Sequence, residues 1–426
     1  MASAVGILLS LGSAQAADLG GNCCADLEER VADLEATTVR KGNRKVSLTL
    51  TGQVDKQIMY MSDDRSSRTI AGVDNINASS RFWFAGSASI SSSVKAGFEM
   101  MIEWAGSSRS DFINQVTTVN GTWTQSANSS GDGSLAIRTA NWWLEDSRLG
   151  RVTVGRVNIQ GPASIIDISG ADVQLIAWSN PTLQGGSLYL ASSGGGTYYT
   201  NTLANLAPYC YGCSREEGIR YDTASIGGLI LGAFWGEQDR FTVQARYANE
   251  FNGVQIAAGA GYQHDNNVTT NNLNPSVSGT SRSDIEQQAY ALSLKHVATG
   301  IFVQANTGKT NWKLLNGATG KNDGTMWQIQ AGVARNFFGP GIASFYGEYG
   351  HAQGYASGTS ASSFGGTTIT SDSVDYYGFG MTQKIDAAAM TLYLGWRHFD
   401  PKVSADSASV SLSEIDTVIG GARIQF

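Results

Sequence analysis

The chain has 426 residues, a formal net charge of −7 and 51 glycines; only 15% of its residues are charged, while 10% are aromatic. The acidic balance argues against general nucleic-acid binding, which needs a basic surface. No run of about 20 apolar residues, as a transmembrane helix requires, occurs beyond the extreme N-terminus. A composition poor in charge and rich in glycine favours a β-barrel with one face in lipid, with a soluble β-sandwich or β-helix as the alternative.

The N-terminal residues have the pattern of a secretory signal. The stretch "AVGILLSLG" (4–12) is a short apolar core, and "AQA" (14–16) fits a small-x-small cleavage site. We therefore assign residues 1–16 to a signal peptide and leave them out of the fold. No basic region precedes the apolar core, which leaves the true start of the signal open.

A helix is predicted over residues 26–39, "DLEERVADLEATTV", within an N-terminal segment that spans 17–45. Asp26 and Glu29 form a capping-box pattern. An apolar seam follows at heptad-like spacing in Leu27, Val31, Leu34 and Thr38. Because two heptads do not hold a helix on their own, the helix either packs on the body of the protein or forms a short coiled coil between subunits.

From residue 46 onward the hydrophobic pattern has a period of two, which predicts strands. In "VSLTLTGQVDKQIMY" (46–60), for example, Val54 and Ile58 share one face while Asp55 and Gln57 share the other. The strands mostly run 10–15 residues, against about 5–6 in globular proteins and about 9–11 in membrane barrels. We expect sixteen strands, at 46–60, 79–90, 94–104, 135–146, 149–158, 216–224, 228–236, 240–250, 252–264, 286–296, 300–312, 324–336, 340–351, 373–384, 388–399 and 413–426.

The connections between these strands alternate in length. Turns of one to four residues alternate with long connections at 61–78, 105–134, 159–215, 265–285, 313–323, 352–372 and 400–412; one connection on the long side, 237–239, is short. An even strand number with loop length segregated by side is typical of an outer-membrane barrel, whose closed wall pairs all backbone groups. The sequence therefore predicts a transmembrane barrel over residues 46–426.

The longest connection, 159–215, contains no regular pattern, and long loops of this kind are either functional or misassigned. Its apolar stretches "ASII" (163–166) and "VQLIAW" (173–178) are suited to packing against the inside of the barrel. Cys210 and Cys213 near its end are candidates for a local disulfide in an exported protein. Cys23 and Cys24 are adjacent and hard to pair with each other, which leaves interchain bridges or free thiols open.

In their order along the chain, four stretches resemble a general porin of Gram-negative bacteria, most of all those of alphaproteobacteria. They are "SSRFWFAGSASI" (79–90), "LGRVTVGR" (149–156), "GIRYDT" (218–223) and the terminal "RIQF" (423–426). The resemblance implies a trimeric sixteen-stranded barrel in the lipid and lipopolysaccharide of the outer membrane. Each pore would pass small hydrophilic solutes and be narrowed by the third extracellular loop, here 159–215. It also implies that residues 17–45 are periplasmic, where residues 23–40 offer a site for an envelope partner.

Charged residues on the inward face set the selectivity of such a pore. By strand parity the inward candidates include Arg81, Lys95, Glu99, Arg220, Asp222, Arg246, Lys295, Glu348, Arg397 and Arg423. The resemblance further implies an arginine cluster on the wall, and it places Arg81, Arg138, Arg156 and Arg220 there; strand parity adds Arg246 as a fifth wall arginine. Loop carboxylates face such a cluster in the family, and we assign this role to Asp167 and Asp172, the acids in the first half of the loop.

Two of these arginines do not follow the strand pattern. Arg138 shares its parity with Trp142, and Arg156 shares its parity with the apolar Val152 and Val154. Gly155 directly precedes Arg156 and allows a bulge that turns the arginine inward.

The leading prediction is a passive, weakly selective diffusion channel. A substrate-specific channel for a sugar or an anion is the first alternative, and a structural outer-membrane protein anchored through its N-terminal helix is the second. No GxSxG or HExxH motif occurs, and none of the four histidines lies near a serine or cysteine motif. We therefore expect neither an enzyme nor a bound metal or other cofactor.

Overall fold

The computed structural model of the chain describes residues 46–105, 109–115, 118–119, 122–123, 135–159, 167–178, 181–194, 196, 198–207, 215–266, 282–314, 322–356, 360–361, 367–405 and 408–426. The predictions for the signal peptide (1–16), the N-terminal helix (26–39), Cys23, Cys24 and the Cys210–Cys213 disulfide lie outside these ranges. Contacts divide the chain into two units, Met1–Ser47 and Leu48–Phe426, and the account below concerns the second.

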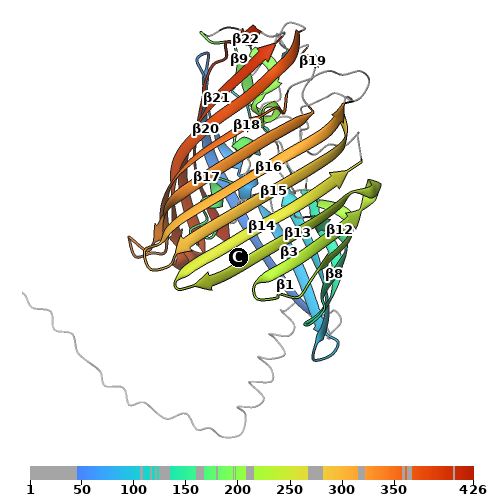
Figure 1. The fold of residues 1–426 in the computed structure, drawn as a ribbon. Coiled ribbons are helices and arrows are strands. Elements are labelled where there is room, and N and C mark those ends of the chain that lie inside the picture. The colour runs from blue at the N-terminus through green and yellow to red at the C-terminus, as the bar shows by residue number, and fades with distance from the viewer. Residues whose placement is uncertain are drawn as a thin grey trace, which may run out of the picture. The chain divides into compact units, whose positions relative to one another are not determined.

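Sixteen strands of the described residues form one closed antiparallel barrel (Figure 1). They are β1 (Ser47–Ser62), β3 (Arg81–Ser89), β4 (Val94–Trp104), β7 (Leu135–Asp146), β8 (Gly150–Asn158), β11 (Arg215–Asp222), β12 (Leu229–Gly236), β13 (Phe241–Phe251), β14 (Val254–Asp265), β15 (Arg282–His296), β16 (Ile301–Leu314), β17 (Asp323–Arg335), β18 (Ala343–Gln353), β20 (Thr367–Ile385), β21 (Met390–Ala405) and β23 (Ile415–Gln425). The ring closes because β1 pairs with β23 on one side and with β3 on the other. All sixteen predicted strands are confirmed.

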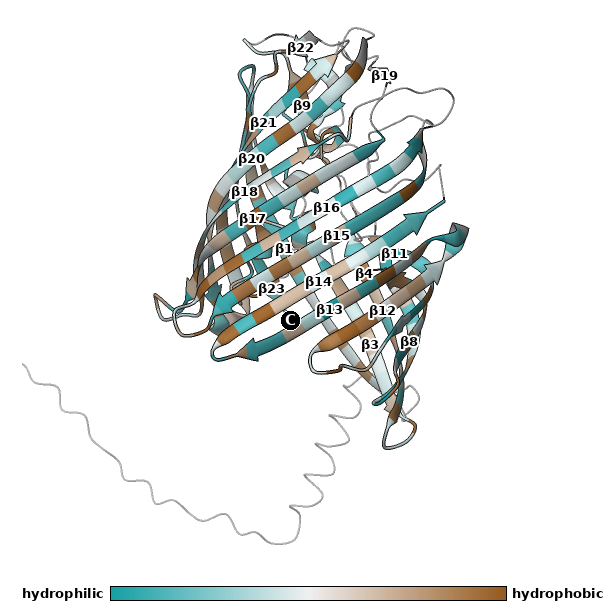
Figure 2. Ribbon diagram, in the orientation of Figure 1, coloured by the Kyte–Doolittle hydropathy of each residue, from teal (hydrophilic) through white to brown (hydrophobic). Residues whose placement is uncertain are grey.

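The period-two pattern gives the wall two chemically different faces. In β1, Val54 and Ile58 are more than half exposed on the outer side, whereas Asp55 and Gln57 are buried on the inner side. The same division holds in β15, where Tyr290 and Leu292 point outward and Gln287 inward. Figure 2 shows the resulting alternation of hydrophobic and hydrophilic residues along the strands. An exposed apolar outer face on a closed wall is the arrangement that lipid requires.

The shorter elements lie mainly in the connections. The short strands are β2 (Ser67–Asp74), β5 (Thr118–Val119), β6 (Thr122–Trp123), β9 (Tyr189–Ala191), β10 (Tyr198–Thr202), β19 (Ser360–Ala361) and β22 (Ala408–Val410). The 3-10 turns are η1 (Ile76–Ala78), η2 (Val173–Leu175), η3 (Pro181–Leu183), η4 (Leu203–Asn205), η5 (Glu237–Asp239) and η6 (Asp386–Ala388). In the part of the chain that the structure describes, no helix combines the length and the apolar content needed to cross a membrane.

Three wall strands extend further than their hydrophobic pattern predicts. β15 begins at Arg282, β20 begins at Thr367, and β21 continues to Ala405. The added residues of β20 include "TTITSD", in which Ile369 is the single apolar residue, so no alternation marks them as strand. For the same reason β2 is a strand within the predicted connection 61–78; it pairs with the second half of β1. The wall is therefore tall at β20 and β21, with 19 and 16 residues, and low at β11 and β12, with 8 each.

A hydrophobic core fills part of the barrel interior. Inward side chains of the tall half of the wall, among them Phe302, Tyr376 and Phe399, pack in one buried cluster with Val173 and Leu175 of the connection 159–215. Each of these side chains is at most 1% exposed. The sequence predicts that the apolar stretch 173–178 packs against the wall, and its residues Val173 and Leu175 do contact this cluster of wall side chains.

The two faces lead to a prediction with a pair of isomeric residues on β12. Leu231 is 47% exposed on the outer face, whereas its neighbour Ile230 lines a cavity inside the barrel. Leu231→Arg should lower the free energy of unfolding in lipid vesicles by about 1–2 kcal/mol, because an arginine on the lipid face is costly. Ile230→Arg should cost less than half as much, since water reaches that side. Equal losses in denaturant titrations of the two variants would contradict the assignment of the faces.

Candidate functional site

Residues 167–178, called the inner segment below, are held by polar side chains of the wall. Five side chains bind its backbone. Gln304 Oε1 accepts a hydrogen bond from the Ile168 N–H at 3.1 Å. The other four donate to carbonyl groups: Lys295 Nζ to Ser169 at 2.6 Å, Thr382 Oγ1 to Ala171 at 2.5 Å, Gln330 Nε2 to Ala177 at 2.7 Å, and Asn75 Nδ2 to Leu175 at 2.9 Å. A segment without strand partners needs such substitutes, because buried backbone groups that stay unpaired are costly.

Close packing fixes the inner segment from its other side. Ile176 is 4% exposed and lies directly against Gly395 of β21. A Cβ at position 395 would overlap the Ile176 side chain. Glycine is therefore required there for the backbone of the wall and the inner segment to approach each other.

The two carboxylates of the inner segment are already bound. Asp172 Oδ2 lies 2.7 Å from Arg423 Nη2 and 3.7 Å from Lys384 Nζ, and it accepts a hydrogen bond from Thr391 Oγ1 at 2.8 Å. These partners come from β23, β20 and β21. Asp172 itself has a left-handed backbone with φ 60°, an arrangement that aspartate tolerates better than most residues.

Asp167 has a different, local role. Its carboxylate accepts hydrogen bonds from the backbone N–H groups of Ser169 and Gln174 at 2.9 and 3.1 Å, which folds the inner segment on itself. Neither Asp167 nor Asp172 lines the cavity that holds the predicted wall arginines. This differs from the expectation that the two carboxylates face those arginines: the course of the segment carries them to other partners.

A cavity of about 1470 Å³ lies on the low side of the barrel, against β3, β4, β7, β8, β11 and β13. Trp178 and Leu183 of the connection 159–215 line its other side. Among the described residues that line it, nine are arginines and six are carboxylates: Arg81, Arg109, Arg138, Arg151, Arg156, Arg215, Arg220, Arg240 and Arg246, with Glu99, Glu103, Glu145, Asp146, Asp222 and Asp265. We call it the charged cavity.

All five predicted wall arginines line the charged cavity, and two of them reach it through local irregularities. At Arg138 the register of β7 against β4 shifts, because Met101 pairs with Thr139 and Ile102 with Ile137. Arg138 is the extra residue of this β-bulge, which lets it point inward while Trp142 stays outward and 54% exposed. At Arg156 the irregularity is the preceding Gly155, whose φ of 121° few other residues adopt. The expected bulge is absent there, because β8 pairs with β7 and β11 without a register shift through Gly155 and Arg156.

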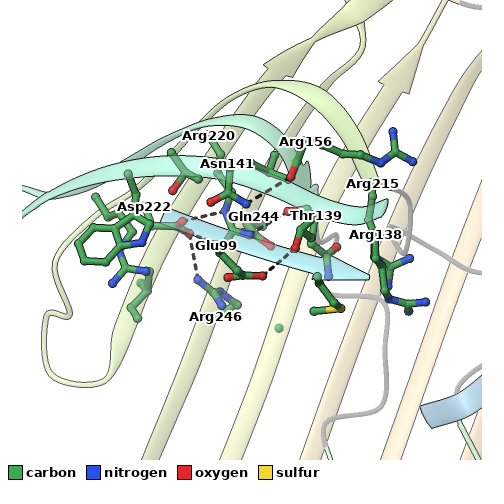
Figure 3. Close-up of a pocket in the computed structure, with 18 of the residues that line it drawn as sticks. Glu99, Arg138, Thr139, Asn141, Arg156, Arg215, Arg220, Asp222, Gln244 and Arg246 are labelled. Carbon is green, nitrogen blue, oxygen red and sulfur yellow. Dashed lines mark hydrogen bonds and ion pairs between the residues drawn. The ribbon is translucent and has the colours of Figure 1, made fainter. Parts of the chain in front are cut away.

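Ion pairs organise one end of the charged cavity. Arg220 and Arg246 both bind Asp222, at 2.7 and 2.9 Å (Figure 3). Near the middle, Glu99 accepts a hydrogen bond from Thr139 Oγ1 at 2.8 Å. Part of the lining is thus held by ion pairs and hydrogen bonds, and charges interact more strongly in enclosed water than in bulk solvent.

The other predicted inward residues lie elsewhere. Arg397 is buried and forms a bidentate pair with Glu348, at 2.9 and 3.0 Å, on the tall side of the wall. Arg423 binds Asp172, as described above. Lys95 pairs in register with Ser89, beside the turn between β3 and β4, and is exposed. None of the three lines the charged cavity.

Several charged residues of the cavity were not predicted. Glu103 shares the parity of Glu99 on β4 and could have been found from that signal. Arg109 lies in the connection after β4, where no strand pattern places it. Arg240 comes directly before β13 and shares the parity of Arg246 within the predicted strand 240–250, so it could also have been found from that signal. Arg240 pairs with Glu216 of β11 and Asp265 of β14.

The second half of the connection 159–215 is hydrogen-bonded to the connections that follow β1 and β4. Tyr198 Oη donates to Asp63 Oδ2 at 3.0 Å, and Gln115 Nε2 donates to the same carboxylate at 3.0 Å. Burial, together with the nearby Asp63, raises the pKa of Tyr198 to about 12. The phenol therefore stays protonated and keeps donating at neutral pH.

Known proteins show the same fold. A family model described as Gram-negative porin matches residues 2–404. The chain is similar to the anion-selective porin from Comamonas acidovorans (14% identity, TM-score 0.52, 89% of this chain and 100% of that one). It is also similar to the trimer form of OmpT, an outer membrane protein of Vibrio cholerae (11%, 0.51, 89% and 99%), and to Salmonella typhi OmpF in complex with daunomycin (15%, 0.50, 90% and 98%). No curated protein sequence matches the chain significantly.

The bond between Asp172 and Arg423 gives a prediction about stability. Asp172→Asn should lower the free energy of unfolding by about 3 kcal/mol, because it leaves the Arg423 guanidinium, 6% exposed, without its counter-charge. Asp167→Asn should cost less, about 1–2 kcal/mol, since the single amide oxygen keeps only one of the two backbone N–H bonds. Combining Asp172→Asn with Arg423→Gln should recover part of the loss, and strictly additive losses would contradict a direct coupling.

Proposed function

Because the chain belongs to the Gram-negative porin family, we propose that its pore is narrowed by the connection 159–215 and favours anions. The family and the closed barrel make it a multi-pass outer-membrane protein and a channel for passive diffusion. The narrowing of the pore and its preference for anions are the proposal, and both are supported by contacts and charges inside the barrel.

The narrowing is supported by the bonds that hold the inner segment. Five polar side chains with inward parity or in loops bind its backbone, and Ile176 fits against Gly395. A segment held this way occupies the half of the interior next to β15–β23. Solutes are then left with the half that contains the charged cavity.

The preference for anions is supported by the composition of that cavity, and this is the observation that carries the proposal. Its described lining has nine arginines and six carboxylates. Arginine stays charged at every physiological pH. The excess of fixed positive charge raises the local concentration of anions in an enclosed aqueous path. A substrate-specific anion channel is the second candidate, for the same reason.

We also propose a homotrimer in lipid and lipopolysaccharide. The trimer form of OmpT, a structure with the same fold, supports this assembly. A periplasmic role for residues 17–45, with residues 23–40 contacting a neighbouring subunit or an envelope partner, remains a proposal from the sequence.

The first test is the reversal potential of the reconstituted protein. In a planar bilayer with a potassium chloride gradient, the zero-current potential should have the sign of chloride preference, because the lining carries surplus arginine. A reversal potential of cation sign would overturn the selectivity, and a protein that folds but never conducts would overturn the channel itself.

The second test removes the constriction. Deletion of residues 167–178 should raise the single-channel conductance roughly twofold, because a wider water path carries more ions. A deletion of equal length at 267–278, in another connection, serves as the control and should leave conductance unchanged. Unchanged conductance after the first deletion, in a barrel that still folds, would place the inner segment outside the rate-limiting path.

A further inference from the structure

One end of the charged cavity gathers arginines from separate strands. Figure 3 shows Arg138, Arg156 and Arg215 together at this end, away from the group of Arg220, Asp222 and Arg246. Arg81 belongs with them, because Arg138 and Arg215 are close enough to repel its charge. We call Arg81, Arg138, Arg156 and Arg215 the guanidinium cluster; they come from β3, β7, β8 and β11.

The cluster has more positive charge than its carboxylates balance. Glu103 is the one carboxylate bound to the cluster: its Oε2 binds Arg138 and also accepts a hydrogen bond from Ser79 Oγ at 2.8 Å, so one negative charge faces four guanidinium groups in this part of the described chain. Arg81 and Arg156 form no ion pair with any residue that the structure describes. Like charges held together in this way repel one another, and an anion between them would remove that repulsion.

Several hydrogen-bond donors at the cavity are unfilled. The Nε groups of Arg81, Arg138 and Arg156 are buried and have no acceptor within the described chain. The indole Nε1 of Trp178, which lines the same cavity from the inner segment, also lacks one. Buried donors without acceptors cost free energy, so a cavity that keeps four of them suits a ligand that supplies oxygens.

Local structure holds the cluster in place. The guanidinium of Arg81 lies over the ring of Trp83, with 5.2 Å from Cζ to the ring centroid. The bulge at Arg138 and the positive φ of Gly155 bring the other side chains inward. Rigid placement reduces the entropy lost on binding, which favours recognition over a diffuse field.

We propose that the guanidinium cluster is a saturable binding subsite for a doubly charged oxyanion such as phosphate or sulfate. This rests on the proposed channel and deepens it by naming a solute class. A guanidinium presents two parallel N–H groups that match two oxygens of one oxyanion, whereas chloride offers no such pair of acceptors. A doubly charged oxyanion also neutralises more of the excess positive charge of the guanidinium cluster than a singly charged anion does.

The test measures how phosphate and sulfate inhibit chloride current. With the full chain in planar bilayers at low ionic strength and mildly alkaline pH, inorganic phosphate added to potassium chloride should reduce the current along a saturating curve. Sulfate should reduce the current in the same way if the site binds any doubly charged oxyanion and not phosphate alone. Arg81→Gln and Arg156→Gln should each raise the half-inhibiting concentration about tenfold, the effect of about 1.4 kcal/mol.

Two control variants separate a site from a general field. Arg151→Gln removes the same charge from the cavity at the residue that binds Glu145, and it should change the half-inhibiting concentration less than about twofold. Arg81→Lys keeps the charge but loses the paired N–H groups, so it should still weaken inhibition severalfold.

The outcomes are distinguishable. Three results would each contradict the subsite while leaving the channel intact. The first is inhibition that does not saturate. The others are a half-inhibiting concentration that rises equally in Arg151→Gln and Arg156→Gln, and one that is unchanged in Arg81→Lys. A correctly folded protein without chloride current would instead overturn the proposed function. Heat-dependent gel mobility of each variant establishes that the barrel is folded before its currents are compared.

Discussion

The structure depends on one constraint, which is that every backbone N–H and C=O of the wall must be paired without water. Lipid offers no hydrogen bonds, so a sheet in a membrane must close on itself. Here β1 provides the closure, with β23 on one edge and β3 on the other. Closure fixes a continuous register around the ring, and the register assigns each residue to lipid or to the interior. The outer row of Val54 and Ile58 and the inner row of Asp55 and Gln57 follow directly from it.

The interior is then divided by the inner segment. This stretch has no strand neighbours, and it satisfies its backbone with side chains of Gln304, Lys295, Thr382, Gln330 and Asn75. Its apolar side chains join Phe302, Tyr376 and Phe399 in a core on the tall side of the barrel. The low side keeps its water-accessible space, and the charges there remain available to solutes. The anion selectivity that we propose therefore depends on two features: the arginines of the charged cavity, and the position of the apolar core on the tall side, which leaves the low side open.

The two departures from strand regularity both deliver a cation to the charged cavity. The bulge at Arg138 separates its direction from that of Trp142, and Gly155 permits the turn that brings in Arg156. The bulge interrupts the ladder at Arg138, whereas the pairing of β8 continues through Gly155 and Arg156. At both positions strand parity alone would send the arginine toward lipid. Local rules are commonly broken where function requires it. The Nε groups of Arg81 and Arg156 have no hydrogen-bond acceptor in the described chain. Neither arginine stabilises the fold through an ion pair with a described residue, which agrees with a functional role.

The amino-acid sequence by itself determined the wall, because the alternation of residues such as Val54 and Asp55 needs no knowledge of distant partners. It could not mark β2 or the first residues of β20, where apolar and polar residues do not alternate. It placed Arg81, Arg220 and Arg246 on the inward face. It predicted a bulge at Gly155, where the structure instead has a positive φ within unbroken pairing. Only the tertiary structure decided which charges meet: Asp172 binds Arg423, some 250 residues away in the chain, rather than the wall arginines. The physical reason is that a segment without periodicity takes its course from packing, here of Ile176 against Gly395, and packing partners are fixed only when the barrel has closed around them.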